Sequence, residues 1–245
     1  MEALAPRVAP ADRRFEAPDL IDALEQAERY NRHLLDRVLG FAGPARTVLD
    51  FGAGGGQLAA ALAARGMHVT AVEPDPALRE RLAARGIPCV AALDALGARR
   101  FDYIVSLNVL EHCPDDAGIV RALHRHLDPG GRCLVYVPAF PLLWTANDTR
   151  VGHRRRYTRS GLRQLFRGAG FGVADVRYVD SLGFFAALAY RWLGRADGQL
   201  TPRSVRLYDR FLFPASRRLD GVLHPLLGKN LLLRARRGPV GEPSP

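Results

Sequence analysis

A short glycine-rich segment constrains this chain more than any other part of its sequence. The apolar run Thr47–Phe51 is followed by glycines at 52, 54 and 56, and the alanine-rich stretch Gln57–Arg65 comes directly after them. Glycine permits positive φ and lets a ligand approach the main chain closely, and the first turn of a helix presents unpaired N–H groups to an anionic group. The segment therefore predicts a strand, a ligand-binding turn and a helix.

Two carboxylates beside this turn indicate what kind of ligand it binds. Asp50 precedes Gly52 by two residues, and Glu73 ends the next apolar run, at the distance where Rossmann-like sites place an acid for the ribose hydroxyls. The spacing Gly-x-Gly-x-Gly differs from the Gly-x-Gly-x-x-Gly of pyrophosphate binders, and Asp50 would repel a pyrophosphate but can bind an ammonium group. The turn therefore favours a nucleoside with an amino-acid tail over a nicotinamide or flavin dinucleotide.

Beyond this turn, expected strands alternate with expected helices, which predicts an α/β fold with a mostly parallel sheet covered on both faces. The strands are expected at 47–51, 68–73, 88–92, 101–107, 132–137, 173–179 and 230–236, and the helices at 57–65, 76–85, 115–127 and 160–169. A further helix is expected to begin at Asp19. Residues 128–131 are expected to form a turn and residues 140–157 an irregular loop.

The same patterns predict one domain with a helical addition. We expect residues 1–18 to be a loose leader, 19–237 to be the domain and 238–245 to be a disordered tail. Residues 181–228, between the last two strands, carry an apolar stripe interrupted by arginines, which indicates a helical insert. Three interpretations of this insert remain open: a cap packed on the domain, a hydrophobic pocket for an acceptor, or a basic amphipathic element resting on a membrane surface.

Composition limits the kind of protein without identifying a partner. The chain is 48% hydrophobic and 24% charged, as in ordinary globular domains. It has three cysteines with no metal-ligand spacing and no apolar run of about 18 residues, which favours a cytoplasmic protein with reduced thiols. The net charge of +10 arises almost entirely from arginine, since Lys229 is the single lysine. This charge describes either a solvated basic surface or attraction to an anionic partner.

Several motifs, in the same order, resemble the class I S-adenosylmethionine-dependent methyltransferase superfamily. Segment 50–56 resembles its first motif, Glu73 its second-strand acid, 93–96 the segment that borders the adenine, and 127–131 its LxPGG turn. The resemblance implies a Rossmann-like seven-stranded sheet with an antiparallel last strand, and S-adenosylmethionine as the cofactor. The cofactor-binding residues that it implies are Asp50, Gly52, Ala53, Gly54, Gly56, Glu73, Pro74, Asp94, Ala95, Asn108 and Val109.

The segment Asn108-Val-Leu-Glu-His112, after the expected fourth strand, is similar to the VLEH signature of ubiquinone-type O-methyltransferases. In those enzymes an acid-x-x-Glu-His group is associated with a divalent metal. Here Asn108, a neutral and weaker ligand, replaces the first acid, and we therefore expect no metal. His112 is a candidate catalytic residue. The alternative is that Glu111 and His112 cap a helix and pack in the cofactor pocket.

A second segment, Asp148 followed by Gly152-His-Arg-Arg-Arg-Tyr157, resembles a D…GHxRRY motif found in a group of bacterial methyltransferases. Two interpretations remain open. In one, His153 is a general base or an acceptor ligand oriented by Asp148, and arginines clamp a phosphate or carboxylate of the acceptor. In the other, the loop is structural and its arginines pair with Asp148. The expected substrate-binding residues are Tyr30, Asn31, Trp144, Arg155, Arg156 and Tyr157.

Together these features predict a methyltransferase that acts on a small molecule, with oxygen as the expected acceptor atom and nitrogen as the alternative. The acceptor is expected to be apolar, or linked to a lipid or a sugar phosphate. No nucleic acid is expected as a partner, because the sequence lacks both the Asn/Asp-Pro-Pro-aromatic signature of amino-methylating DNA enzymes and an aromatic-basic platform for RNA. A nucleic-acid or protein methyltransferase and a non-catalytic cofactor-binding protein stay open as alternatives, as does contact with the inner face of a membrane.

Overall fold

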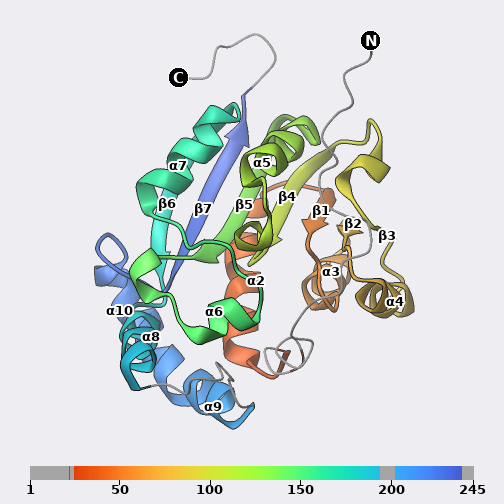
Figure 1. Ribbon diagram of the computed structural model, residues 1–245. Helices are drawn as coiled ribbons and strands as arrows, with labels where there is room; N and C mark the ends of the chain where they lie inside the picture. Colours follow the sequence, from red (N-terminus) through yellow and green to blue (C-terminus); the bar gives the residue numbers. More distant parts are fainter. Residues whose placement is uncertain (1–21, 23–24, 194–201, 239–245) are drawn as a thin grey trace.

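The computed structural model describes residue 22 and residues 25–193 and 202–238. The expected leader, the expected helix start at Asp19 and nearly all of the expected tail lie outside these residues. A seven-stranded sheet forms the centre of the molecule, in the order β3-β2-β1-β4-β5-β7-β6 (Figure 1). Its strands are β1 (Thr47–Phe51), β2 (His68–Val72), β3 (Cys89–Val90), β4 (Phe101–Leu107), β5 (Leu127–Pro138), β6 (Phe171–Val179) and β7 (Asn230–Arg237).

The strand directions follow the Rossmann-like expectation. Strands β1 to β5 are parallel to one another, whereas β7 is antiparallel to both β5 and β6. Parallel neighbours need long crossovers, and helices provide them here. The expected seven-stranded sheet with an antiparallel last strand is therefore confirmed.

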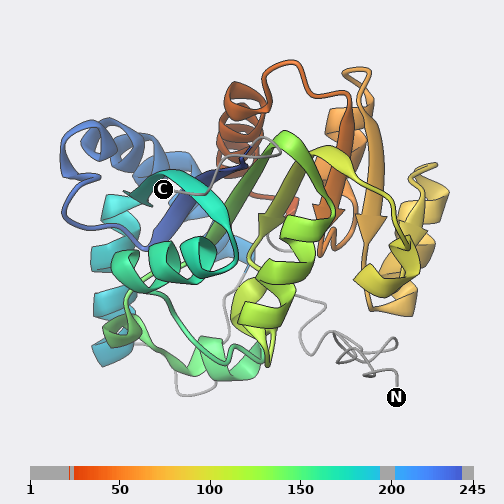
Figure 2. The same cartoon turned by 90° about the horizontal axis from the view of Figure 1, so that it is seen from above.

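Helices cover both faces of the sheet, and each face has its own buried apolar cluster. The helices are α2 (Glu28–Ala42), α3 (Gln57–Ala63) and α4 (Pro76–Ala84) on one face, and α5 (Asp116–Arg125) and α7 (Arg159–Gly168) on the other. Figure 2 shows α5 and α7 on one side of the strands and α2 on the opposite side. Leu62 of α3 and Phe166 of α7 are fully buried, one in each cluster. Because both faces are covered, the central strands are apolar on both sides.

Local sequence signals set the starts of these helices. Asp75 caps α4, since its Oδ1 accepts hydrogen bonds from the backbone N–H groups of Ala77 at 2.8 Å and Leu78 at 3.4 Å. Pro76 occupies the first turn, where its missing N–H would have no partner within the helix. Thr158 caps α7 in the same way as Asp75 caps α4. Such caps satisfy backbone donors that the helix itself leaves unpaired.

The expected turn at residues 128–131 is instead a bulge inside a strand. Strand β5 begins at Leu127, which pairs with Phe101, and the next paired residues are Arg132 and Tyr103. Residues 128–131 therefore bulge away from β4, at a place where a glycine at 130 takes a φ of +77°. The turn prediction was wrong because the Asp-Pro-Gly-Gly sequence lets the backbone bulge while the strand continues on both sides.

The segment expected as an irregular loop contains two short helical turns, η3 (Pro141–Leu143) and α6 (Ala146–Arg150). A capping box begins α6, and in it Thr145 N donates a hydrogen bond to Oδ2 of Asp148 at 2.8 Å. The sequence did not predict α6 because five residues are too few for a recognisable apolar period.

The insert between β6 and β7 is helical in its described part. It consists of α8 (Ser181–Leu193), α9 (Pro202–Leu207), the π-helical turn η4 (Tyr208–Leu212) and α10 (Phe213–Leu223). In Figure 1 these helices lie beside the sheet and below it, and α8 contacts η3. No helix in the described part of the chain is long and apolar enough to cross a bilayer.

The carboxyl ends of the parallel strands meet at one edge of the sheet, the lower edge in Figure 1. The segments that follow β1, β2, β4 and β5 therefore converge there. Open α/β sheets bind their ligands at this edge, and the residues singled out in the sequence lie on these segments.

Candidate functional site

The glycine turn after β1 has the conformation that its sequence predicts. Gly52 has a φ of +78°, and a Cβ at this position would stand 2.3 Å from Cγ2 of Val109. No side chain therefore fits between the turn and the segment after β4. Gly54 has a φ of +54°, and nothing lies within 4 Å of its Cβ position, so its outer side is open to a ligand. Gly56 N donates to Ala53 O at 3.0 Å and closes the turn.

Glu73, directly after β2, holds this turn in place. Its Oε2 accepts a hydrogen bond from Gly54 N at 2.8 Å, and its Oε1 accepts one from Asp75 N at 3.0 Å. Burial raises the pKa of Glu73 above its usual value, and these two backbone hydrogen bonds act against that rise. Each carboxylate oxygen has a second lone pair, so Glu73 can hold the turn and accept ribose hydroxyls at the same time.

Asp50 is a buried carboxylate behind the turn, with 2% of its surface exposed. Its Oδ2 has no hydrogen-bond partner in the described part of the chain. Burial and then the neighbouring charge of Glu73 raise the pKa of Asp50 to about 7. A buried carboxylate without a partner is unfavourable, and the ammonium group of a ligand would pair with it. The turn therefore fits a nucleoside with an amino-acid tail.

Other predicted cofactor residues lie on two segments at the same edge of the sheet. Pro74 follows Glu73 in the segment after β2, and its carbonyl accepts a hydrogen bond from Nη1 of Arg79 at 2.6 Å. Asp94 and Ala95 are exposed in the 3-10 turn η1 (Leu93–Leu96), which follows β3. Exposed groups at this position are accessible to a ligand base, and the role of Asp94 and Ala95 in binding the adenine remains a prediction.

Side chains of helix α2 lie near the glycine turn and near the segment after β4. Asn108 has a φ of +55°. Burial raises the pKa of the Tyr30 hydroxyl, and the side chains of Tyr136 and Asn108 act against that rise. Tyr30 packs edge-on against Tyr136 of β5, with ring centroids 6.3 Å apart. Nδ2 of Asn31 donates to Oε1 of Gln57, at the start of α3, at 3.4 Å. Tyr30 and Asn31, expected to bind substrate, thus lie beside the glycine turn itself.

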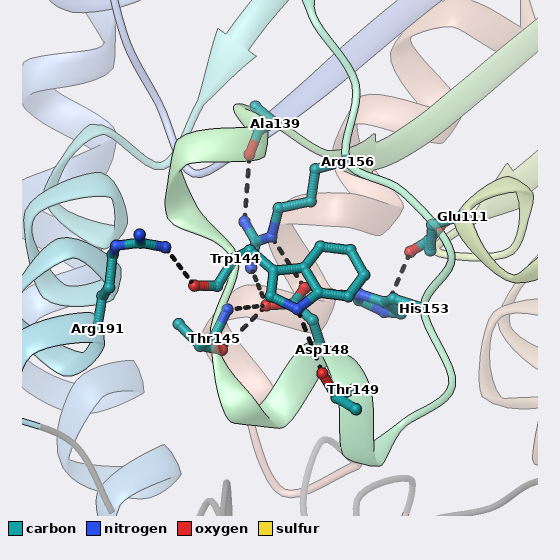
Figure 3. A network of polar contacts seen from close by, with 9 residues as sticks. All are labelled: Glu111, Ala139, Trp144, Thr145, Asp148, Thr149, His153, Arg156 and Arg191. Carbon is teal, nitrogen blue, oxygen red and sulfur yellow. Dashed lines mark hydrogen bonds and ion pairs between the residues drawn. The ribbon is translucent and has the colours of Figure 1, made fainter. Parts of the chain in front are cut away.

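His153 and Asp148 form a hydrogen-bonded pair in the loop after β5 (Figure 3). Nδ1 of His153 lies 2.7 Å from Oδ1 of Asp148. Arg156 holds the same carboxylate through Nε to Oδ1 and Nη2 to Oδ2, both at 2.9 Å, and donates a third hydrogen bond to Ala139 O at 3.1 Å.

This arrangement determines the tautomer of a neutral imidazole. Burial acts to raise the pKa of Asp148, but the hydrogen bonds from His153 and Arg156 outweigh it and hold that pKa well below its usual value. Because Asp148 stays ionised, Nδ1 of a neutral His153 carries the ring proton and donates a hydrogen bond to the carboxylate. Nε2 then has the lone pair, and it can accept a proton from a ligand.

Glu111 lies on the other side of the His153 ring. Its Oε1 is 3.8 Å from Nε2 of His153, and neither carboxyl oxygen has a hydrogen-bond partner among the described residues. Burial raises the pKa of Glu111 to about 8, so the group is mostly uncharged at neutral pH. The ring of His112 contacts the ring of His153, with centroids 4.7 Å apart.

Glu111, His112 and His153 each offer a ligand atom, and these atoms all lie within 4.8 Å of one another. Two imidazoles and one carboxylate can bind a transition-metal ion. Asn108, which replaces the first acid of the resembled metal group, has its side chain near Tyr30 instead. The expectation that the site works without a metal remains a prediction.

The last three residues of the GHxRRY segment, Arg155, Arg156 and Tyr157, are engaged in contacts within the protein. Arg155 pairs with Asp116 at 2.8 Å, and the Tyr157 hydroxyl donates to the same carboxylate at 2.9 Å. The Arg156 side chain is only 6% exposed, and Asp148 already occupies its planar donor face. These contacts are the ones expected of a structural loop. Of the two arginines, Arg155 alone keeps a third of its side chain, 31%, exposed.

Two contacts join the insert to the candidate site, and the sequence did not predict them. Nη1 of Arg191 in α8 donates to Trp144 O at 3.0 Å (Figure 3), and the Trp144 side chain is half-buried. Asp209 of η4 accepts hydrogen bonds from the backbone N–H groups of Arg29 at 3.1 Å and Tyr30 at 2.8 Å, and so caps α2. Asp209 and Arg29 are 180 residues apart, and no local sequence signal links them.

Comparisons with known proteins agree with this geometry. A family model described as a methyltransferase domain matches residues 23–176. The Ubiquinone biosynthesis O-methyltransferase of Psychrobacter arcticus is 38% identical over 110 residues, which are 40% of this chain and 42% of that protein. The protein of the same name from Xylella fastidiosa is 41% identical over 98 residues, which are 36% of this chain and 40% of that protein. The chain thus spans about two-fifths of the length of these relatives.

Solved structures share the fold at low sequence identity. A SAM-dependent methyltransferase from Thermotoga maritima has a TM-score of 0.58 at 16% identity, covering 91% of this chain and 98% of its own. A chain of the complex between the Haloferax volcanii Trm112 methyltransferase activator and a methyltransferase has a TM-score of 0.60 at 17% identity, covering 93% and 100%. The [4+2]-cyclase SpnF has a TM-score of 0.56 at 21% identity, covering 84% and 80%.

Proposed function

The chain belongs to the methyltransferase domain family, and from this premise we propose that it uses S-adenosylmethionine to methylate an oxygen of a small-molecule acceptor, with His153 as the general base. The hydrogen-bonded pair of Asp148 and His153 is the single observation that carries the choice of oxygen. The names of the curated relatives, which are O-methyltransferases, support the same choice.

The residues around the glycine turn would hold the cofactor. When bound, S-adenosylmethionine supplies a methyl group on a positively charged sulfur, which leaves as a neutral thioether. Asp50 would pair with the ammonium of the amino-acid tail, and Glu73 would accept the ribose hydroxyls. Val109 packs against the turn, and the same segment continues to His112, whose ring contacts His153. The cofactor turn and the candidate base are therefore connected by one short segment.

His153 would accept the proton of an acceptor hydroxyl at Nε2 while the acceptor oxygen forms its bond to the methyl carbon. General-base catalysis contributes typically ~10²–10⁴-fold to such a step. Asp148 would stabilise the imidazolium that forms, and Arg156 keeps Asp148 in position. Glu111, mostly uncharged at neutral pH because of its burial, adds little negative charge beside the ring.

The acceptor that fits best has an apolar part next to an anionic group. The half-buried indole of Trp144 belongs to the same loop as the base (Figure 3) and offers an apolar surface. Arg155 remains partly exposed although it pairs with Asp116, and it can contact a phosphate or carboxylate. A hydroxyl compound that is apolar, or linked to a lipid or a sugar phosphate, meets both conditions.

The direct test is transfer of a labelled methyl group from S-adenosylmethionine to fractions of a cell lysate by the full chain. We expect label on oxygen in a small-molecule fraction. His153→Gln should reduce the rate by about 10²-fold or more without changing cofactor affinity. His68→Gln, exposed at the start of β2, is the matched control and should keep the wild-type rate. Label confined to nucleic acid or protein, or an unimpaired His153→Gln variant, would contradict the proposal.

A chelation experiment separates a proton-accepting His153 from a metal ligand. We expect the rate to stay the same after treatment with EDTA and dialysis, because the proposed step needs the lone pair of Nε2. Loss of activity that an added metal ion restores would instead assign Glu111, His112 and His153 as ligands, and the general-base role would then be wrong.

A further inference from the structure

The segment formed by α9, η4 and α10 buries polar side chains on its inner side and exposes large apolar side chains, together with arginines, on its outer side. Its buried residues are Asp209, Phe213, Ser216 and Asp220, which recur every three or four positions along one helical face. The large apolar residues that it exposes are Leu207 (58%), Phe211 (62%), Leu212 (44%), Leu219 (41%) and Val222 (77%). This is the reverse of an ordinary surface helix, and exposed apolar surface of this extent marks an interaction site.

Hydrogen bonds fix this orientation of the segment. Asp220 accepts hydrogen bonds from the backbone N–H groups of Asp180 at 2.9 Å and Ser181 at 2.8 Å, where α8 begins. Asp209 caps α2. Rotating the segment to bury its apolar side would leave these backbone donors without partners, which is costly in the interior. The exposed apolar surface is therefore a property of the native fold.

The charged side chains on the outer side of this segment are all positive. They are Arg203, Arg206, Arg210, Arg217 and Arg218, each of them exposed. The two acids between residues 203 and 223, Asp209 and Asp220, are buried and serve as hydrogen-bond acceptors for helix ends. The outer side therefore combines apolar and cationic groups, and between residues 203 and 223 it has no exposed carboxylate.

A hollow of about 520 Å³ lies between the start of α2 and this segment. The arginines at 203, 206 and 210 line it together with Leu207 and Phe211. Its other charged residues are Glu28 and Arg29 of α2, whose charges offset each other, and Asp209, whose carboxylate already caps α2. Guanidinium groups beside apolar side chains match a phosphate beside hydrocarbon. Such a pair of groups occurs at the surface of a phospholipid bilayer.

We propose that the outer side of residues 203–222, the α9–α10 surface, docks on an anionic lipid bilayer. Its apolar side chains would enter the boundary between headgroups and hydrocarbon, and its arginines would pair with lipid phosphates. A second copy of the chain fits less well, because a two-fold contact would bring the same arginines against each other. A nucleic acid would satisfy the arginines but would leave Leu207, Leu212 and Val222 against a polar backbone.

The α9–α10 surface is connected to the candidate site by two contacts. Helix α8 packs against α10, and its Arg191 holds the carbonyl of Trp144. Asp209, on the inner side of the same segment, caps α2 next to Tyr30. An enzyme docked in this way would have its acceptor side near the lipid. Docking goes beyond the proposed function and does not depend on it, since lipid binding can be measured without an acceptor.

Co-sedimentation of the full chain with vesicles tests the proposal. We expect binding to vesicles of equal parts phosphatidylcholine and phosphatidylglycerol, little binding to phosphatidylcholine alone, and weaker binding at high salt. The double variant Arg206→Glu/Arg210→Glu should lower the affinity about tenfold or more, since each basic group near an anionic surface contributes to attachment. Arg100→Glu/Arg121→Glu changes the net charge equally at two exposed arginines outside this surface, and should have a much smaller effect.

A second variant separates docking from general attraction of a basic protein. Phe211→Ser/Val222→Ser keeps the charge and should also reduce vesicle affinity severalfold, with circular dichroism and cofactor binding unchanged. Four results would each overturn the proposal. Two concern the variants: equal losses of affinity in the two charge variants, or wild-type affinity in Phe211→Ser/Val222→Ser. The other two are stronger binding to duplex DNA than to vesicles, and a dimer that forms through this surface. Vesicle binding without methyl transfer to any acceptor would contradict the proposed function alone.

Discussion

Asp148 and His153 lie 2.7 Å apart through Oδ1 and Nδ1, and Nε2 on the far side of the same ring faces Glu111 at 3.8 Å. The carboxylate is held by Arg156 as well, so it remains ionised and orients the imidazole. An orienting carboxylate of this kind fixes the tautomer of a general base without itself taking up the proton. The pair can therefore be tested by removing the charge at 148 while the imidazole stays.

Asp148→Asn tests the orienting role. The amide can donate to Nδ1 and so stabilise the wrong tautomer, and it gives Arg156 no charge to pair with. We expect the rate of methyl transfer at saturating cofactor to fall by roughly 10²–10⁴-fold, with cofactor affinity unchanged by calorimetry. Asp175→Asn, which removes another carboxylate paired with an arginine, at 2.7 Å from Arg177, should leave the rate unchanged. An Asp148→Asn enzyme as fast as wild type would show that His153 is not the base.

Gly54→Ala tests the cofactor turn against a matched glycine elsewhere. Gly54 and Gly66 both have positive φ, +54° and +82°, and neither has an atom within 4 Å of its Cβ position. Alanine at either site should lower the free energy of unfolding by a similar amount, about 1–2 kcal/mol. Only Gly54→Ala should also weaken cofactor binding, by about tenfold or more, because the new methyl group occupies the open side of the turn. Equal cofactor affinity in the two variants would move the binding site away from this turn.

The parts of the site that the sequence predicts are those with local signals. The glycines of the turn, Asp50 and Glu73 lie within or next to strands β1 and β2, and both the apolar runs and the required positive φ can be read from neighbouring residues. The mostly parallel strand directions follow from the alternation of strands and helices, and the antiparallel last strand follows from the resemblance to a known family. The β5 bulge was not predicted because its turn-forming residues are the same ones that permit a bulge.

The parts that the sequence does not predict depend on distant partners. Asp209 caps α2 from 180 residues away, and Asp220 holds the start of α8 although nothing in its own helix requires an acid there. The pairing of Arg156 with Asp148 was one of two open interpretations, since an arginine pattern alone does not say which anion the guanidinium meets. The inverted exposure of the α9–α10 surface likewise follows from these buried acids.

The pKa of Asp50 predicts how cofactor binding depends on pH. Burial and the neighbouring Glu73 raise that pKa to about 7, so below pH 7 the carboxyl is mostly neutral and cannot pair with an ammonium group. We expect cofactor affinity, measured by calorimetry, to be weaker at pH 6 than at pH 7.5 by on the order of tenfold. Asp50→Asn should bind weakly at both pH values and lose this dependence. A variant with the wild-type pH profile would place the ammonium elsewhere.

The pKa of Glu111 predicts how the free energy of unfolding depends on pH. Burial raises that pKa from its usual 4.5 to about 8. Below pH 4.5 the carboxyl is protonated in both the folded and the unfolded chain, so its ionisation does not lower the free energy of unfolding there. Between pH 4.5 and 8 the unfolded chain releases the proton while the folded chain keeps it, and stability is lost at up to about 1.4 kcal/mol per pH unit.

Glu111→Gln keeps the shape of the side chain and removes its titration, so it isolates this effect. We expect the stability of Glu111→Gln relative to wild type, measured by urea unfolding, to increase steadily from pH 5 to pH 8 and then to level off. Glu80→Gln, at an exposed position of α4, should show no such increase. The difference in stability between Glu111→Gln and wild type could instead stay constant with pH. The Glu111 carboxyl would then be ionised and paired with a cation in solution, and Nε2 of His153 would face a charged group.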